Sequence, residues 1–220
     1  MTNSIIFGAR GGLGAAFVAA LSPEVIGFSR QSTPPVDLLD EASIAAAAAT
    51  IVGTPRLIID ATGFLHGGGF MPEKSFAALD PAHMAHSFAV NAIGPALLLK
   101  HFLPLLPREG RAVFVTLSAK VGSIGDNRAG GWTSYRAAKA ALNQIVHTTA
   151  IELQRKRPEA ICIAMHPGTV DTGLSSPFGK AGLNVRKPAA AVDEMLKVID
   201  NLTNADTGKF FSYDGTELPW

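Results

Sequence analysis

The stretch Ile5-Ile6-Phe7-Gly8-Ala9-Arg10-Gly11-Gly12-Leu13-Gly14 decides the fold of this 220-residue chain. It opens with three large apolar residues that predict a buried strand, and its glycines lead directly into an Ala-rich helical segment. Glycines permit a tight turn and a close approach of the backbone to a pyrophosphate, while the helix N-terminus offers free amides to phosphates. A plain strand-to-helix turn is the alternative. The GxxxGxG spacing favours a dinucleotide-binding turn at Gly8, Arg10, Gly12, Leu13 and Gly14.

Outward from this turn, short aliphatic runs alternate with Ala- and Leu-rich stretches of helical period. This pattern predicts βαβ units and one Rossmann-fold domain over residues 1–220, a doubly wound parallel sheet with helices on both faces. The predicted strands are 4–8, 25–29, 56–61, 111–118, 160–166 and 209–213, and 34–37 is a candidate for one more short strand. The predicted helices are 12–21, 41–52, 81–103, 134–156 and 188–202.

Three segments rich in Gly, Pro or polar residues, 63–81, 121–133 and 169–187, are predicted to be loops. Each follows a predicted strand. Because ligands bind beyond the carboxyl ends of parallel strands, these three loops are expected to surround the site.

Composition excludes several classes of protein. The 19 basic and 18 acidic residues give a net charge of +1, which does not favour nucleic-acid binding. With 47% apolar and 17% charged residues, the chain can bury a large core. His83 and His86 lack a third ligand at metal-like spacing, so no metal site is expected.

The same features bear on location. Cys162 is the one cysteine and cannot form an internal disulfide, and the first residues lack the pattern of a signal peptide. The longest apolar helical stretch, 88–106, is interrupted by polar and proline residues. We therefore expect a soluble, cytoplasmic protein without a membrane span.

Tyr135 and Lys139 are four residues apart in a predicted helix, so they are neighbours on one face. A tyrosine ordinarily has a pKa of about 10. A nearby ammonium, and a positive nicotinamide in the oxidised complex, both favour the phenolate and are expected to lower that pKa, which would make the pair an acid/base at neutral pH. An ordinary helix surface is the alternative for such a pair alone.

Two further groups are candidates for the same chemistry. Ser118 ends a predicted strand, where its hydroxyl is placed to polarise a substrate carbonyl. Pro95 cannot donate a helical bond to the carbonyl of Asn91, which is thereby released and able to hold a water. A helix kink tolerated for packing is the alternative for this second feature.

The end of the second predicted strand, Gly27-Phe28-Ser29-Arg30, lacks the acid that binds the ribose hydroxyls of NAD. Arg30 is expected to pair with a 2′-phosphate, with Arg10 on its other side. NADP(H) is therefore expected, and NAD(H) is the alternative. Solvated surface charges are the alternative interpretation of both arginines.

Taken in order, these residues resemble the short-chain dehydrogenase/reductase family, and the likeness covers the whole chain. The segments that carry it are Gly8, Gly12 and Gly14, then Asp60-Ala61-Thr62-Gly63, Asn91, Ser118, Tyr135 with Lys139, and Pro167-Gly168-Thr169-Val170-Asp171-Thr172. Residues 121–127, 135–143 and 213–220 look like the C-factor and small carbonyl reductase branch.

The resemblance implies specific roles. Tyr135 is the proton donor to a carbonyl oxygen, Lys139 holds the nicotinamide ribose, Ser118 positions the carbonyl, and Asn91 anchors a water. The expected cofactor contacts are Gly8, Arg10, Gly12, Leu13, Gly14, Ser29, Arg30, Asp37, Leu38, Ala61, Thr62, Gly63, Asn91, Tyr135, Lys139, Pro167, Gly168, Val170 and Thr172.

The chain also departs from the family pattern. The segment between the second strand and Asp37 is short, so an outer helix is missing. Asp60 replaces an asparagine, and Ser123 competes with Ser118 as the catalytic hydroxyl. The short loop between Leu174 and Pro188 implies an open pocket with weak specificity.

The implied function is hydride transfer between NADPH and a small ketone or aldehyde, or the reverse oxidation of an alcohol. A cofactor-binding signalling or regulatory protein with little turnover is the alternative, as proposed within the C-factor branch. Hydrolysis is excluded because no Gly-x-Ser-x-Gly elbow surrounds Ser118.

We also expect self-association. The helices that carry Asn91 and Tyr135 show apolar residues on more sides than one sheet-facing stripe uses. In the family these helices commonly pack against a partner copy, which implies a homodimer or tetramer. The alternative is a monomer in which the loop 121–133 covers this surface.

Overall fold

The computed structural model describes residues 4–178 and 184–220. Its centre is a parallel sheet of six strands in the order β2-β1-β3-β4-β5-β6. The strands are β1 (Ser4–Phe7), β2 (Val25–Phe28), β3 (Leu57–Asp60), β4 (Ala112–Leu117), β5 (Ala160–His166) and β6 (Phe210–Ser212). The chain crosses over between β2 and β3, so the sheet has its topological switch point between β1 and β3.

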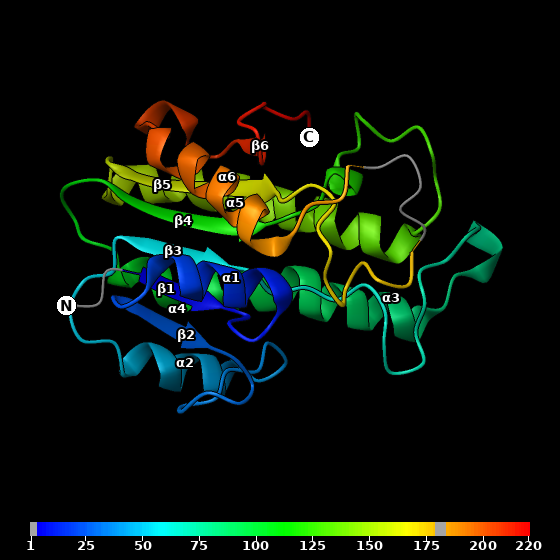
Figure 1. Ribbon diagram of the computed structural model, residues 1–220, viewed down its shortest axis with the longest axis horizontal. Helices are drawn as coiled ribbons and strands as arrows, with labels where there is room; N and C mark the ends of the chain where they lie inside the picture. Colours follow the sequence, from blue (N-terminus) through cyan, green and yellow to red (C-terminus); the bar gives the residue numbers. More distant parts are fainter. Residues whose placement is uncertain (1–3, 179–183) are drawn as a thin grey trace.

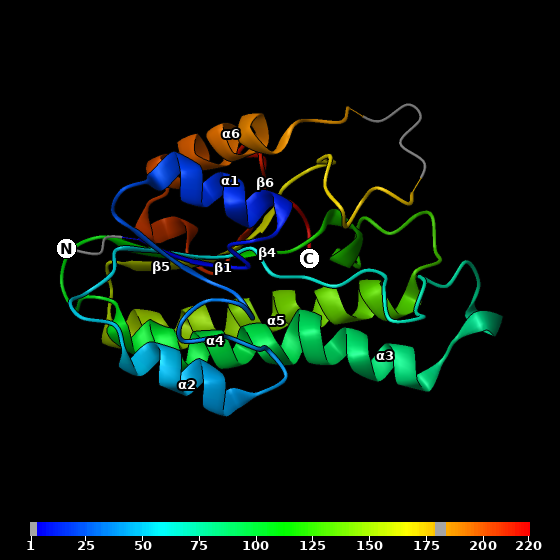
Figure 2. The same cartoon turned by 60° about the horizontal axis from the view of Figure 1, so that its bottom comes forward.

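Helices cover both faces of the sheet, as Figure 2 shows in three layers. One face carries α1 (Gly12–Leu21) and α6 (Pro188–Asn201), and the other carries α2 (Glu41–Ala49), α4 (Gly94–Phe102) and α5 (Thr133–Lys156). The remaining helix, α3 (Pro81–Phe88), packs along α5 and extends past the sheet (Figure 1). The predicted doubly wound α/β fold is confirmed.

The strands lack polar alternation because both of their faces are buried. Ile5 and Phe7 pack into the core on the α4–α5 side, and Ile6 packs into the core under α1 and α6. All three side chains are fully buried. A continuous apolar run is therefore what a central strand of this sheet requires.

The candidate strand at 34–37 is wrong: these residues form irregular structure. Pro34 and Pro35 have no amide donors for a ladder. The Asp37 carboxylate accepts from the amide of Leu39 at 3.0 Å, and the Asp37 amide donates to Ser43 Oγ at 2.9 Å. Local side-chain bonds thus replace strand pairing ahead of α2.

The predicted helix 81–103 is continuous in path but not regular. A π-helical segment, η2 (Ala89–Ile93), separates α3 from α4, and the short 3₁₀ turn η3 (Leu103–Leu105) follows. Pro95 lies just after η2, where its missing amide disturbs the helical ladder. The disturbance predicted at Asn91 is therefore a widened turn rather than a simple kink.

By length and composition alone, the stretch Pro81–Leu105 is apolar enough to cross a membrane. Length and composition therefore do not decide the expectation of no membrane span, which stays a prediction. Packing identifies its role here, since Leu98, Leu99 and Phe102 are buried in the core against the sheet.

The segments that follow β3, β4 and β5 gather at one end of the molecule, beyond the carboxyl ends of the strands (Figure 1). These are the loops predicted at 63–81, 121–133 and 169–187. The first includes a short turn, η1 (Phe76–Ala78), and the second continues from η4 (Lys120–Gly122). Part of the third, residues 179–183, lies outside the described residues.

Candidate active site

A cavity of about 900 Å³ lies at the carboxyl end of the sheet. Its wall comes from the glycine turn before α1, from all three loops, and from α5. Of the predicted site residues, the wall includes Arg10, Gly12, Leu13, Ala61, Thr62, Gly63, Ser118, Tyr135, Lys139, Pro167, Gly168, Val170 and Thr172.

The glycine turn is packed so closely that side chains do not fit. A Cβ on Gly14 would lie 2.0 Å from the carbonyl oxygen of Gly8, and one on Gly12 would lie 2.6 Å from Cγ2 of Thr172. Gly8 has φ +73°, a conformation that favours glycine. The α1 N-cap, Gly11, makes no side-chain cap, so the first amides of the helix are open to a phosphate. These residues fit a dinucleotide.

Tyr135 and Lys139 lie in the first turns of α5 and are 7% and 2% exposed. Lys139 Nζ donates to the carbonyl of Leu117 at 2.9 Å and lies 5.9 Å from the centre of the Tyr135 ring. Burial raises the pKa of Tyr135 and lowers that of Lys139 to about 8. The expected lowering of the Tyr135 pKa is therefore wrong for the protein alone, because burial of the phenol disfavours the phenolate.

Ser118 lies on the cavity wall, but its hydroxyl is engaged. Its Oγ donates to Oδ1 of Asn143 on α5 at 2.6 Å. Ser123 is also buried, accepts from the amide of Asp126 at 3.0 Å, and is not part of the wall. A hydroxyl has one proton to donate. Ser118 must therefore leave Asn143 before it can donate to a carbonyl.

Asn91 is fully buried in η2, and its side chain forms hydrogen bonds with the loop that follows β3. Its Nδ2 donates to the carbonyl of Phe64 at 2.8 Å, and its Oδ1 accepts from the amide of Phe64 at 2.9 Å. A Cβ on Gly63 would lie 3.7 Å from Asn91 Oδ1 and 4.0 Å from Lys139 Nζ. Asn91 thus holds Gly63 beside the Lys139 ammonium.

Some predicted cofactor residues are not part of the cavity wall, and these include Ser29, Arg30, Asp37 and Leu38. Leu38 packs against α4, because a Cβ placed on Gly94 would lie 2.6 Å from the Cβ of Leu38. Ser29 and Arg30 follow β2, the edge strand, and Arg30 is exposed.

The wall also contains an aromatic pair that the sequence did not indicate. The rings of Trp132 and Phe178 are 5.0 Å apart, and Trp132 lies edge-on to Tyr135 at 6.4 Å. Trp132 is the N-cap of α5 and has φ +52°. The pair Gly130-Gly131 before it was the one local sign of an unusual backbone. An apolar surface therefore stands beside the Tyr135 phenol.

Glu73 holds the start of α5. Its carboxylate accepts from both the amide and the hydroxyl of Ser134, and its carbonyl accepts from the Trp132 amide at 2.6 Å. The Glu73 side chain is 2% exposed. A carboxylate at a helix N-terminus is favourable, so Glu73 stabilises the turn that carries Tyr135.

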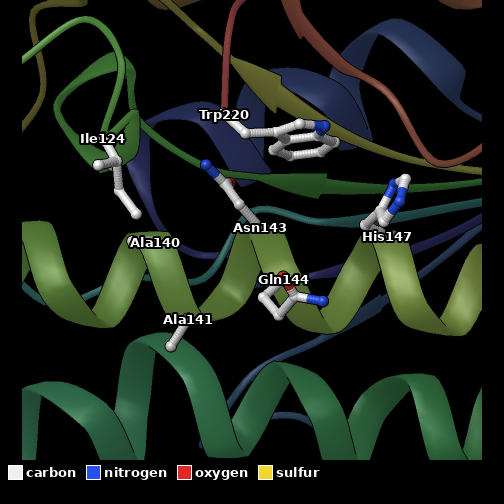
Figure 3. A pocket seen from close by; sticks show the side chains of 8 residues that line it. Ile124, Ala140, Ala141, Asn143, Gln144, His147 and Trp220 are labelled. Atoms are coloured by element: carbon white, nitrogen blue, oxygen red, sulfur yellow. The ribbon is translucent and has the colours of Figure 1, made fainter.

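A smaller cavity of about 490 Å³ lies against α5, and Figure 3 shows the side chains that line it. Its wall consists of Gly122, Ile124, Ala140, Ala141, Asn143, Gln144, His147 and Trp220. The Trp220 indole lies above α5 between Asn143 and His147 (Figure 3). None of the predicted catalytic residues belongs to this cavity, so the larger one is the candidate active site.

Comparisons with known proteins agree with this geometry. A family model described as enoyl-(acyl carrier protein) reductase matches residues 14–206. The chain is 37% identical over 144 residues to the C-signal protein of Myxococcus xanthus, covering 64% of this chain and 81% of that protein. It is 34% identical over 188 residues to 1-hydroxy-2-glutathionyl-2-methyl-3-butene dehydrogenase of Rhodococcus sp. (strain AD45), covering 85% and 79%.

Among solved structures, the NADPH-bound carbonyl reductase from chicken fatty liver superposes with a TM-score of 0.84. It is 26% identical in sequence, and the match covers 100% of this chain and 94% of that one.

Proposed function

Since the chain belongs to the short-chain dehydrogenase/reductase family, we propose that it is an NADPH-dependent reductase of small ketones or aldehydes. The observation that carries the proposal is the shared cavity. The same cavity of about 900 Å³ is lined by the glycine turn, by Lys139 and by Tyr135. A dinucleotide laid from the turn toward α5 would bring its reactive end to Tyr135.

In this proposal the chain's own residues bind, orient and protonate. The open amides at the start of α1 bind the pyrophosphate, and Lys139 binds the nicotinamide ribose. Trp132 and Phe178 exclude water around the substrate. When bound, the dinucleotide supplies a hydride to the carbonyl carbon.

Tyr135 gives its phenolic proton to the carbonyl oxygen as the alcohol forms. Its raised pKa keeps the proton on the phenol at neutral pH, which suits reduction. Asn91 acts indirectly, because it holds Gly63 beside Lys139. Ser118 orients the carbonyl after its hydroxyl has left Asn143 and donates its hydrogen bond to the substrate instead.

The preference for NADP(H) over NAD(H) rests on two arginines. Arg10 lines the cavity at the glycine turn. Arg30 follows β2, at a position where an NAD-binding protein would carry a carboxylate that binds the ribose hydroxyls. Similar structures support this choice, since the chicken enzyme is NADPH-bound and a Burkholderia multivorans relative is described with bound NADP.

The test is NADPH oxidation by wild-type protein and Tyr135→Phe with a panel of aldehydes and ketones. The variant keeps the ring and loses the proton, so turnover is expected to fall by at least ~100-fold while NADPH affinity changes little. Tyr213→Phe is the matched control, because it removes the chain's other phenol, which is not part of the cavity wall. Turnover of Tyr135→Phe near the wild-type rate would refute the mechanism.

The second candidate is a cofactor-binding signalling or regulatory protein with little turnover, and the similarity to C-signal favours it. The same panel separates the two. Tight NADPH binding by the wild type without reduction of any carbonyl in the panel would support the second candidate.

A further inference from the structure

Asp60 ends β3 in a position that buries its carboxylate completely. Its Oδ1 accepts from the amide and the hydroxyl of Thr62, at 3.0 and 2.5 Å. Its Oδ2 has no hydrogen-bond partner among the described residues. A buried carboxylate with one free oxygen is costly unless a charge nearby compensates it.

The compensating group lies across the strand ends. Ile58, two residues before Asp60, packs into the core under α4 and α5, so the Asp60 side chain faces the same helices. Its neighbour in register on β4 is Thr116, and the next carbonyl along β4, that of Leu117, accepts from Lys139 Nζ at 2.9 Å. Lys139 therefore lies over the ends of β3 and β4, close to Asp60 but not in direct contact with it.

The cavity wall itself offers Lys139 no free negative charge. Its charged residues are Arg10, Lys120, Asp126, Arg128, Arg136 and Lys139. The one carboxylate among these described residues, Asp126, already pairs with Lys120 at 3.6 Å. Lys139 is thus a buried amine in a largely cationic wall, and Asp60 is the carboxyl group behind it. Burial raises the pKa of Asp60, whereas its bonds to Thr62 and the charge of Lys139 lower that pKa. Burial lowers the pKa of Lys139, and the charge of Asp60 opposes this.

We propose that Asp60 is the buried counter-charge of Lys139, a positioning residue that keeps this ammonium protonated in the active site. The inference rests on the proposed function for its catalytic meaning. A protonated Lys139 can donate to a ribose hydroxyl, whereas a neutral amine would lose charge and one donor. An asparagine at this place would bind Thr62 in the same way but could not hold the charge.

The other titratable groups around Lys139 do not replace Asp60. Tyr135, one turn earlier on α5, has its pKa raised by burial and stays neutral. His166 at the end of β5 has its pKa lowered to about 4 by burial and is neutral as well. Arg10 on the turn before α1 and Lys120 after β4 carry the same sign of charge as Lys139, so neither can be its counter-charge.

The test is the titration of Lys139 by NMR in protein labelled with ¹³Cε-lysine, with its signal assigned from Lys139→Arg. The isosteric variant is Asp60→Asn, and Asp193→Asn, which removes an exposed carboxylate on α6, is the control for net charge. Removing an opposite charge just beyond direct contact is expected to lower the Lys139 pKa by about one unit. The control is expected to leave it unchanged.

The alkaline limb of kcat/KM for carbonyl reduction should move to lower pH in Asp60→Asn by the same amount. Because the NMR titration needs no turnover, a shifted Lys139 pKa in a protein that reduces nothing supports the role of Asp60 and rejects the proposed function. An unshifted pKa in folded Asp60→Asn overturns the inference.

A second measurement does not depend on the variant folding. The ¹³Cγ signal of Asp60 in the wild type should report an ionised carboxylate at neutral pH. A protonated Asp60 at that pH would also overturn the inference.

Discussion

Replacing three glycines one at a time by alanine separates two destabilising effects. One is the strain of a positive φ, and the other is the steric clash of an added Cβ. Gly53 has φ +94° and a Cβ there would meet nothing within 4 Å, so Gly53→Ala carries backbone strain alone. Gly14 is helical, and a Cβ there would lie 2.0 Å from Gly8 O, so Gly14→Ala carries a clash alone. Gly8→Ala carries both, with φ +73° and a contact of 2.8 Å to the carbonyl oxygen of Ala61.

An alanine in the left-handed conformation destabilises the folded protein by about 1–2 kcal/mol. Replacing glycine by alanine also lowers the entropy of the unfolded chain, which stabilises the folded protein by about 0.4–1 kcal/mol. Gly53→Ala should therefore lower the free energy of unfolding by about 0–1.6 kcal/mol. Overpacking costs about 1–3 kcal/mol, and Gly14→Ala belongs at the upper end because the contacted atom is backbone. Gly8→Ala adds strain to a milder clash, which gives about 2–4 kcal/mol.

Thermal unfolding followed by circular dichroism measures this series, with about 2–4 °C of Tm expected per kcal/mol for a chain of this size. Added NADPH should raise the Tm of Gly53→Ala as much as that of the wild type. It should raise the Tm of Gly8→Ala and Gly14→Ala much less, because their turn no longer admits the phosphates. Equal stability of Gly14→Ala and Gly53→Ala would refute the packing argument.

Three further predictions address other parts of the molecule. Arg30→Ala should weaken NADPH binding and leave NADH binding nearly unchanged, measured by titration of both; equal wild-type affinities for the two cofactors would contradict the preference. Burial raises the pKa of the Cys162 thiol to about 12, so a thiol reagent should label this residue only after unfolding, and rapid labelling of native protein would show that β5 opens. We propose a homodimer at least, because Ile93 in η2 and Ile151 in α5 remain 55% and 45% exposed; light scattering should give at least twice 23.0 kDa, and the monomer mass would favour the covering loop.

The sequence by itself determined the features that arise from neighbouring residues. The apolar run Ile5-Ile6-Phe7 and the glycines after it predict a buried strand and a tight turn because both depend on local backbone geometry. Tyr135 and Lys139 share a helix face because four residues complete about one turn. Where local chemistry was misread, as at 34–37, prolines and an Asx turn took the place of a strand.

Only the tertiary structure decided which distant groups meet. The Ser118 hydroxyl bonds Asn143, 25 residues later, and Asn91 grips Phe64, 27 residues earlier. Trp132 meets Phe178 across two loops, and Asp60 at the end of β3 interacts electrostatically with Lys139 on α5. No short-range pattern encodes these contacts, because they follow from how helices pack on the sheet. The pKa values follow from packing too, since burial, and not the adjacent lysine, sets the proton affinity of Tyr135.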